Sequence, residues 1–152
     1  MNNPNKSSIT FSRPLERVTR AIIVGASSGI GEALALRLAR EGYVLALLGR
    51  SEDKLQTLCE KINNDTLGQA AYFVHDVKRT EEVPELFLKV CTALGGLDLF
   101  VYNAGIQFPN DPTVYSAEND LDTFHVNLLG LASWLNLVAI RFQKLKSGHI
   151  VV

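Results

Sequence analysis

A glycine-rich segment near residue 25 has the residue types and the spacing of a phosphate-binding turn. It follows a short apolar run and reads, in order, Gly25-Ala26-Ser27-Ser28-Gly29-Ile30-Gly31. Its first glycine allows a tight turn, its second leaves room for a pyrophosphate close to the backbone, and its third lets a helix pack closely on a sheet. Unpaired N–H groups and the dipole at the start of a helix attract phosphate, and Ser27 and Ser28 add hydroxyl donors. The segment therefore predicts a dinucleotide site. A glycine-rich turn without a ligand is the alternative.

The residue that follows the next apolar run indicates which dinucleotide fits. That run ends in Gly49-Arg50, and no acidic residue follows until Glu52. A carboxylate at this corner would bind the ribose 2′-hydroxyl of NAD. Arg50 would instead pair with a 2′-phosphate through charge-assisted hydrogen bonds, worth about 1.5–3 kcal/mol. The sequence therefore favours NADP over NAD, and a solvated surface arginine is the alternative role for Arg50.

These groups act together only if the ends of successive strands meet. Apolar runs predict strands at residues 21–24, 44–48, 70–74, 99–102 and 149–152, and helical spacing predicts helices at 29–40, 51–62, 80–94 and 121–144. Parallel strands separated by helices require crossover connections. We therefore expect an α/β fold, a doubly wound parallel sheet of the Rossmann type, over residues 19–152. Residues 1–18 predict a flexible N-terminal arm.

The spacing of apolar side chains also predicts the buried face of each helix. These faces are Ile30, Leu34 and Leu38 on the first helix, Leu55, Leu58 and Ile62 on the second, and Phe124, Leu128, Leu131, Leu135, Val138 and Phe142 on the last. Ser51 and Thr80 are expected to cap helices, and Asn63-Asn64-Asp65 is expected to end the second helix.

The composition argues against several kinds of partner. The chain has 152 residues, of which 20% are charged, and a formal net charge of −1. This balance, without a basic stripe, predicts neither a nucleic-acid nor a membrane partner. The most apolar segment, from Val126 to Phe142, is interrupted by polar residues and is short for a membrane span, so we expect a buried helix. Cys59 and Cys91 predict no disulfide, the histidines show no metal-ligand spacing, and the protein is expected to be cytoplasmic.

Several motifs, in register along residues 21–152, resemble those of the short-chain dehydrogenases/reductases. The glycine turn resembles the T-G-x-x-x-G-x-G motif of that family, and Asp76-Val77 resembles the site of its adenine-contacting acidic residue. Tyr102-Asn103-Ala104-Gly105 resembles N-N-A-G, and Asn127 resembles the active-site asparagine. Val24 and Tyr102 depart from the pattern, because the family has threonine and asparagine there. Neither change forbids dinucleotide binding.

The resemblance implies a function and a set of site residues. It implies an NADP-dependent oxidoreductase that transfers a hydride between the nicotinamide and a carbonyl or alcohol substrate. The implied cofactor-binding residues are Gly25, Ser27, Ser28, Gly29, Ile30, Gly31, Arg50, Asp76, Val77, Asn103, Ala104 and Gly105. Asn127 is the implied catalytic residue. The family also implies a homo-oligomer that packs through the helix from Leu121 to Lys144.

The proton-transferring residues of the family are missing from this sequence. In the family a serine follows the fifth strand and a Tyr-x-x-x-Lys pair comes shortly after it. Here no tyrosine has lysine four positions later. We therefore expect the cofactor-binding N-terminal part of an enzyme, truncated before the serine and the Tyr-x-x-x-Lys pair. It is expected to be inactive by itself and to have an exposed strand edge that limits its stability. A non-catalytic NADP(H)-binding module and an inactive remnant are the alternatives. The substrate stays open.

Overall fold

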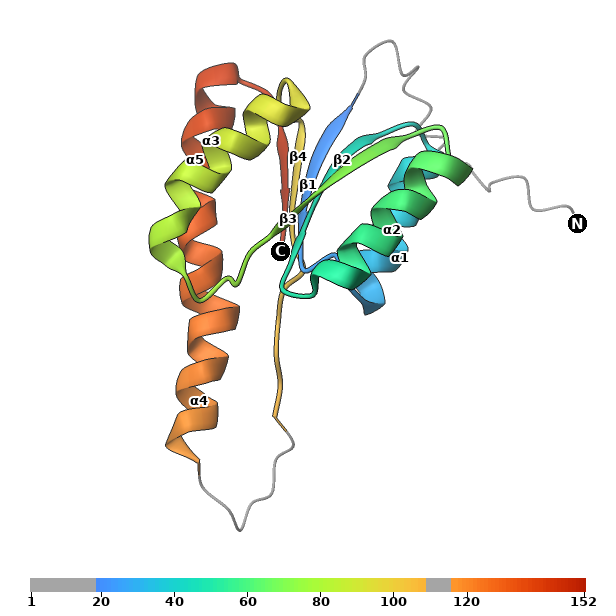
Figure 1. Ribbon diagram of the computed structural model, residues 1–152. Helices are drawn as coiled ribbons and strands as arrows, with labels where there is room; N and C mark the ends of the chain where they lie inside the picture. The colour runs from blue at the N-terminus through green and yellow to red at the C-terminus, as the bar shows by residue number, and fades with distance from the viewer. Residues whose placement is uncertain (1–18, 109–115) are drawn as a thin grey trace, which may run out of the picture.

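The computed structural model describes residues 19–108 and 116–152 and confirms the doubly wound parallel sheet (Figure 1). Its strands are β1 (Arg20–Val24), β2 (Val44–Gly49), β3 (Gln69–Val74), β4 (Leu99–Tyr102) and β5 (His149–Val151). All pairings are parallel, in the order β3-β2-β1-β4-β5. The arm predicted at residues 1–18 lies outside the described residues.

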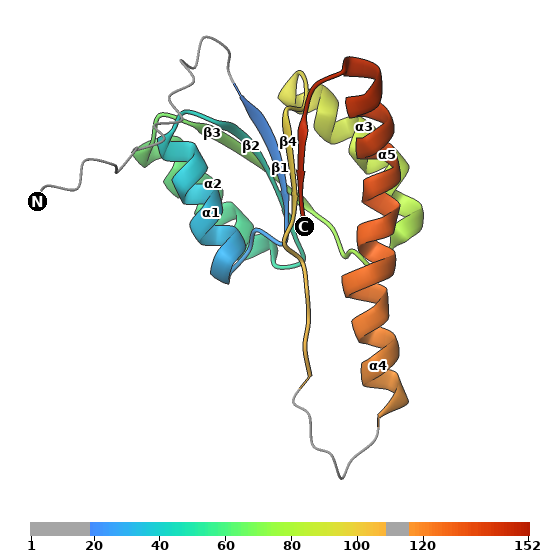
Figure 2. The ribbon, with the colours of Figure 1, turned by 180° about the vertical axis from the view of Figure 1, so that it is seen from behind.

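The helices lie on both faces of the sheet. They are α1 (Gly29–Arg40), α2 (Glu52–Asp65), α3 (Val83–Leu94), α4 (Ala117–Phe124) and α5 (Gly130–Leu145), with a 3-10 turn η1 (Thr80–Glu82) and a π-helical turn η2 (His125–Leu129). Helices α1 and α2 cover one face, while α3 and α5 cover the other (Figure 2). Helix α4 continues the line of α5 beyond the carboxyl ends of the strands.

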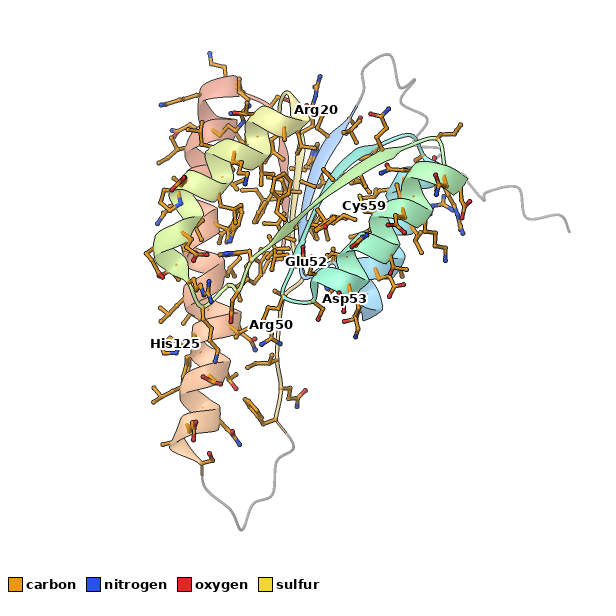
Figure 3. The ribbon with its side chains drawn as sticks, viewed as in Figure 1. Arg20, Arg50, Glu52, Asp53, Cys59 and His125 are labelled. Carbon is orange, nitrogen blue, oxygen red and sulfur yellow. The ribbon has the colours of Figure 1, made fainter. Side chains whose placement is uncertain are left out.

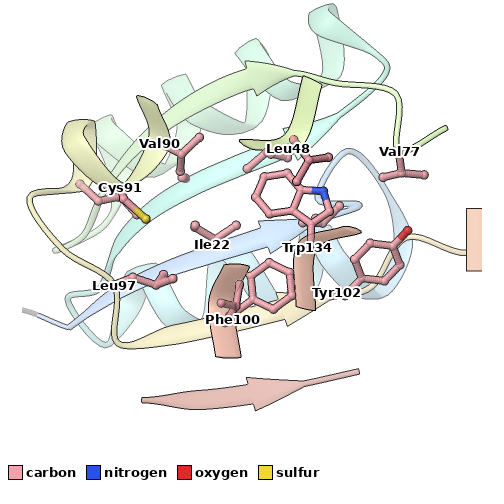
Figure 4. Close-up of a cluster of buried hydrophobic side chains, with 14 of the residues drawn as sticks. Ile22, Leu48, Val77, Val90, Cys91, Leu97, Phe100, Tyr102 and Trp134 are labelled. Carbon is pink, nitrogen blue, oxygen red and sulfur yellow. The ribbon is translucent and has the colours of Figure 1, made fainter. Parts of the chain in front are cut away.

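The sheet is apolar on both faces because each face meets a helical layer. Ile22 and Ile23 are neighbours on β1, and both are fully buried, on opposite sides. On the α3–α5 side Trp134 stacks on Phe100, with ring centroids 5.8 Å apart (Figure 4). Cys59 and Cys91 are free and buried, one in each layer.

The predicted buried face of α1 is wrong, whereas that of α2 is confirmed. Helix α1 turns Gly31, Ala35 and Ala39 to the sheet, and Ile30 is 78% exposed. Small side chains let the helix axis approach the strands closely, so the leucines lie at the sides of the contact. On α2 the predicted Leu55, Leu58 and Ile62 are buried.

Helix α2 also extends beyond its predicted end. The Asn63 carboxamide accepts from the N–H of Ala70 at 2.7 Å and donates to its carbonyl at 3.0 Å. Asn63 therefore ties the helix to the edge strand β3 and does not break it, and α2 runs to Asp65. Neither Ser51 nor Thr80 caps a helix through its side chain, and Thr80 lies in η1.

The long final helix begins earlier than predicted, and its predicted buried stripe is confirmed only at Val138 and Phe142, with Leu131 and Leu135 partly buried. The Ser116 hydroxyl accepts from the N–H of Asn119, so α4 starts at Ala117. The buried side is Val126, Gly130, Trp134, Val138 and Phe142, whereas Phe124 and Leu128 are 59% and 54% exposed. The π turn interrupts the 3.6-residue repeat, so a repeat extended back through residues 125–129 does not predict that Val126 is buried and Phe124 and Leu128 are exposed.

By length and composition alone, Ala117–Leu145 is apolar enough to cross a membrane. In the fold, however, Trp134 and Val138 are fully buried in the cluster on the sheet. Only 22% of the apolar window is buried, so the helix packs on the sheet along one side and the expectation of a buried helix is met only in part.

Candidate functional site

A pocket of about 260 Å³ opens at the carboxyl ends of the strands. It is lined by Gly25, Ser27, Ser28, Gly49, Arg50, His75, Asp76, Val77, Asn103, Ala104, Gly105, Ile106 and Val126. The strand order reverses between β1 and β4, which are neighbours in the sheet. Parallel sheets bind ligands in the crevice at such a switch point. The loops after β1, β2, β3 and β4 thus converge on one pocket.

The glycine turn after β1 is held tightly against the neighbouring strands. The N–H groups of Gly25 and Ala26 both donate to the carbonyl of Leu48, at 2.8 and 2.9 Å. Gly25 has φ +88°, and a Cβ there would lie 2.6 Å from the backbone nitrogen of Ala104. Only glycine meets both demands, the left-handed backbone and the close approach.

Two glycines at the start of α1 have different surroundings. A Cβ on Gly31 would collide with the carbonyl oxygen of Gly25, so Gly31 serves close packing under the turn. Gly29 has φ +60° and nothing within 4 Å of a Cβ, which leaves open space at the helix start. Neither residue, nor the exposed Ile30, lines the pocket itself.

The start of α1 has donors suited to a phosphate. The first N–H groups of a helix have no partner within the helix, and its dipole makes this end positive. Ser28 is the N-cap residue, and its side chain makes no capping hydrogen bond. Ser28 lines the pocket, and a Cβ on Gly29 would meet no atom within 4 Å, so the start of α1 has donors and space that suit a pyrophosphate.

The corner after β2 carries a cationic side chain. Arg50 is exposed, and within residues 19–108 and 116–152 no side chain pairs with its guanidinium. Figure 3 shows Arg50 at the end of the sheet where α2 begins with Glu52 and Asp53. The Glu52 carboxylate instead accepts a long 3.5 Å hydrogen bond from Tyr72.

The segment after β3 forms another wall of the pocket. Asp76 Oδ1 accepts from the N–H of Lys78 at 3.0 Å, which fixes the local turn, and Val77 is 7% exposed. His75 is buried, with its ring edge towards Trp134 and its Nδ1 3.5 Å from Glu82. Burial lowers the pKa of His75, against a smaller opposite effect of Glu82.

The segment after β4 is bound to both the turn and the long helix. Asn103 donates from its amide nitrogen to the carbonyl of Gly25 at 3.1 Å. Asn127 lies outside the pocket lining, but its carboxamide accepts from the N–H of Ile106 at 2.8 Å and donates to the Ile106 carbonyl at 2.9 Å. The expected active-site asparagine thus lies next to the pocket through Ile106.

The pocket also contains residues that the sequence analysis missed: Gly49, His75, Ile106 and Val126. Each of the four adjoins a predicted site residue in the sequence, and for Val126 that neighbour is Asn127. This adjacency was a usable signal.

The same arrangement is found in known proteins. A family profile described as short chain dehydrogenase matches residues 19–152. An uncharacterized oxidoreductase of Staphylococcus haemolyticus is 39% identical over 86% of this chain and 55% of its own length. Glucose 1-dehydrogenase of Gluconobacter oxydans is 38% identical over 74% of this chain and 42% of its own length. The chain therefore spans about half the length of these relatives.

Solved structures agree in fold. An alcohol dehydrogenase from Thermococcus sibiricus, complexed with 5-hydroxy-NADP, superposes with a TM-score of 0.80 at 34% identity over 86% of this chain and 56% of its own. An NAD⁺-bound xylitol dehydrogenase gives 0.81 at 27% identity over 87% and 51%. The family profile covers both the glycine turn and the segment at Asn103. This chain therefore belongs to the short-chain dehydrogenase family, whose members are oxidoreductases with a nicotinamide-dinucleotide-binding fold.

Proposed function

We propose that these residues form the cofactor-binding part of an NADP-dependent oxidoreductase, which transfers a hydride between the nicotinamide and a carbonyl or alcohol group. The observation that carries the proposal is the pocket at the strand ends, which is lined by both Ser28, at the start of α1, and Arg50. The bound cofactor would supply the hydride. The residues of the chain supply binding, orientation and charge.

Each wall of the pocket has a role in this proposal. The N–H groups at the start of α1 and the hydroxyls of Ser27 and Ser28 bind the pyrophosphate. Asp76 and Val77 contact the adenine. The backbone N–H of Lys78 bonds only Oδ1 of Asp76, which leaves Oδ2 as an acceptor for the adenine. The Asn103–Gly105 segment lets the cofactor approach the backbone, and Asn127 orients Ile106 at the pocket edge.

The choice of NADP rests on Arg50. The structural relatives were solved with 5-hydroxy-NADP in one case and with NAD⁺ in another, so the family alone does not select between the two. A 2′-phosphate next to Arg50 gains charge-assisted hydrogen bonds, while the ribose hydroxyl of NAD finds no carboxylate at this corner. The expected preference is about tenfold to a hundredfold.

The 152 residues are proposed to lack turnover by themselves. A carbonyl reduction needs a positioned proton donor, and no tyrosine of this sequence has lysine four positions later. The same observation favours a second candidate function for the isolated chain, a non-catalytic NADP(H)-binding module. Adding NADPH and a panel of carbonyl compounds to the chain alone tests this: no loss of absorbance at the reduced nicotinamide band is expected, and turnover would contradict it.

The proposed assembly is a homo-oligomer that packs through the long helix. Leu121, Phe124 and Leu128 are each more than half exposed and lie on consecutive turns of α4 and η2. An apolar stripe of this kind is a packing surface for a second copy. Light scattering of the chain beside a Phe124→Glu variant tests the proposal. We expect the mass to fall towards that of the monomer in the variant, and equal masses would contradict it.

The binding proposal is tested by mapping NADPH onto the backbone. Titration of ¹⁵N-labelled chain should shift the amide signals of Gly29, Ile30 and Gly31, because their N–H groups would face the pyrophosphate. Amides at the other end of α1, such as those of Ala39 and Arg40, serve as internal controls. Shifts confined to other surfaces, or none at millimolar NADPH, would contradict the proposal.

A further inference from the structure

Tyr102 ends β4, and its side chain reaches the long helix. Its hydroxyl donates to the carbonyl oxygen of Val126 at 2.6 Å, and the residue is only 4% exposed. Figure 4 shows its ring at the rim of the cluster that holds Trp134 and Phe100, with the hydroxyl at the edge. Burial raises the pKa of Tyr102 well above its usual value, so the hydroxyl keeps its proton as a donor.

The acceptor of this hydrogen bond lies in the π-helical turn. In an α-helix the N–H of Gly130 would donate to the carbonyl of Val126, four residues earlier. Here the Gly130 N–H donates to the carbonyl of His125. The turn thus takes the usual donor away from Val126, and the Tyr102 hydroxyl supplies one in its place.

Gly130 leaves the space that this contact needs. A Cβ at position 130 would lie 2.6 Å from the Tyr102 hydroxyl oxygen and 2.9 Å from the carbonyl oxygen of Val77. Its φ of −58° is ordinary helix, so the requirement is for space and not for backbone freedom. The hydrogen bond between Tyr102 and the π turn therefore requires glycine at position 130.

The π turn is connected to the pocket through two consecutive residues, Val126 and Asn127. Val126 lines the pocket itself. The next residue, Asn127, makes two reciprocal hydrogen bonds with the backbone of Ile106, which also lines the pocket. A one-residue rotation of the turn would break both bonds and withdraw Val126 from the wall.

We propose that Tyr102 is a positioning residue of the pocket: its hydroxyl holds the π turn in the register in which Asn127 hydrogen-bonds the backbone of Ile106. The positioning is a property of the free chain. Only its consequence for a dinucleotide rests on the function proposed above.

Hydrogen exchange of the ligand-free chain tests the positioning. In Tyr102→Phe the Ile106 amide, which donates to Asn127, should exchange about fivefold faster or more, the change expected for a lost buried hydrogen bond. Amides of β1 and β2, such as those of Ile23 and Leu47, should keep their rates. Tyr72→Phe is the matched control, since its hydroxyl makes only a 3.5 Å contact with Glu52. Unchanged exchange at Ile106, or equal acceleration of every amide, would overturn the proposal.

A second variant covers the case in which Tyr102→Phe does not fold. Gly130→Ala keeps the hydroxyl but pushes it away from Val126. It should likewise accelerate Ile106 more than the strand amides, and a rate at Ile106 equal to that of the unsubstituted chain would overturn the proposal.

NADPH titration then separates this inference from the proposed function. If the unsubstituted chain binds NADPH, Tyr102→Phe should weaken binding about threefold to tenfold, and Tyr72→Phe should not. Equal affinity of Tyr102→Phe and the unsubstituted chain would overturn the claim that this positioning serves the pocket. If no variant binds NADPH, the proposed function fails, while the exchange rates still decide the role of Tyr102.

Discussion

The amide nitrogen of Asn103 lies 3.1 Å from the carbonyl oxygen of Gly25, to which it donates, across 78 positions of sequence. This bond joins the glycine turn after β1 to the segment after β4, next to a second bond from the Asn103 backbone N–H to the carbonyl of Val24 at 2.8 Å. The two walls of the pocket are thus held at a fixed separation by a side chain from one and a backbone group from the other.

Removing this bond should loosen the turn. In Asn103→Ala the carbonyl of Gly25 loses its side-chain donor in a partly buried place, which should cost about 1–2 kcal/mol of unfolding free energy. Urea unfolding measures this cost. Asn136→Ala, on the exposed side of α5, is the control and should change stability by less than about 0.5 kcal/mol. Equal effects of the two substitutions would count against the proposed bracing.

The glycines at the start of α1 should separate stability from binding. Gly31→Ala forces a methyl group against the backbone carbonyl of Gly25, which cannot move aside as a flexible side chain would. It should destabilise the chain by more than about 2 kcal/mol. Gly29→Ala meets no atom and should cost only about 1 kcal/mol through its left-handed φ.

In Gly29→Ala, however, the methyl group would occupy the space assigned to the pyrophosphate, so NADPH affinity should fall more than stability does. Thermal unfolding and NADPH titration of both variants check this pair. A Gly29→Ala variant with full affinity would show that the open space at the helix start is not used.

The buried His75 should make stability depend on pH. Burial lowers the pKa of His75 below its ordinary value of 6.5, so the folded chain keeps it neutral where the unfolded chain takes up a proton. Stability from this group is therefore complete above the unfolded value and is lost as the pH falls below it, by at most about 1.4 kcal/mol per pH unit.

His75→Phe keeps an aromatic ring against Trp134 and should flatten the stability profile between about pH 5 and pH 6.5, the range just below an unperturbed histidine pKa. Urea unfolding over this range measures the slope, and His149→Gln, at an exposed position on β5, should leave the slope unchanged. Parallel profiles for His75→Phe and the unsubstituted chain would contradict the assignment.

Local patterns predicted the parallel sheet and the glycine turn after its first strand. The run at Ile22 and Ile23 is apolar because it is buried on both faces, and Gly25 and Gly31 stand where backbone meets backbone. These requirements fall on consecutive residues, so they are visible in the sequence.

Features that depend on distant contacts could not be predicted in this way. Asn63 is a residue type that often ends helices, but here its side chain makes two hydrogen bonds with the backbone of Ala70. The π turn at His125–Leu129 interrupts the helical repeat, and no local pattern marks it. The pairing of Asn127 with Ile106 and the hydrogen bond of Tyr102 with Val126 both depend on that turn.

The affinities of the chain for NADPH and NADH, each measured before and after Arg50→Ala, test the central claim most directly. We predict about tenfold to a hundredfold tighter binding of NADPH to the unsubstituted chain, and a loss of most of that preference in Arg50→Ala with NADH affinity unchanged. Arg40→Ala, at the far end of α1, should leave both affinities unchanged. Equal binding of the two cofactors, or a preference that survives the removal of Arg50, would contradict the account.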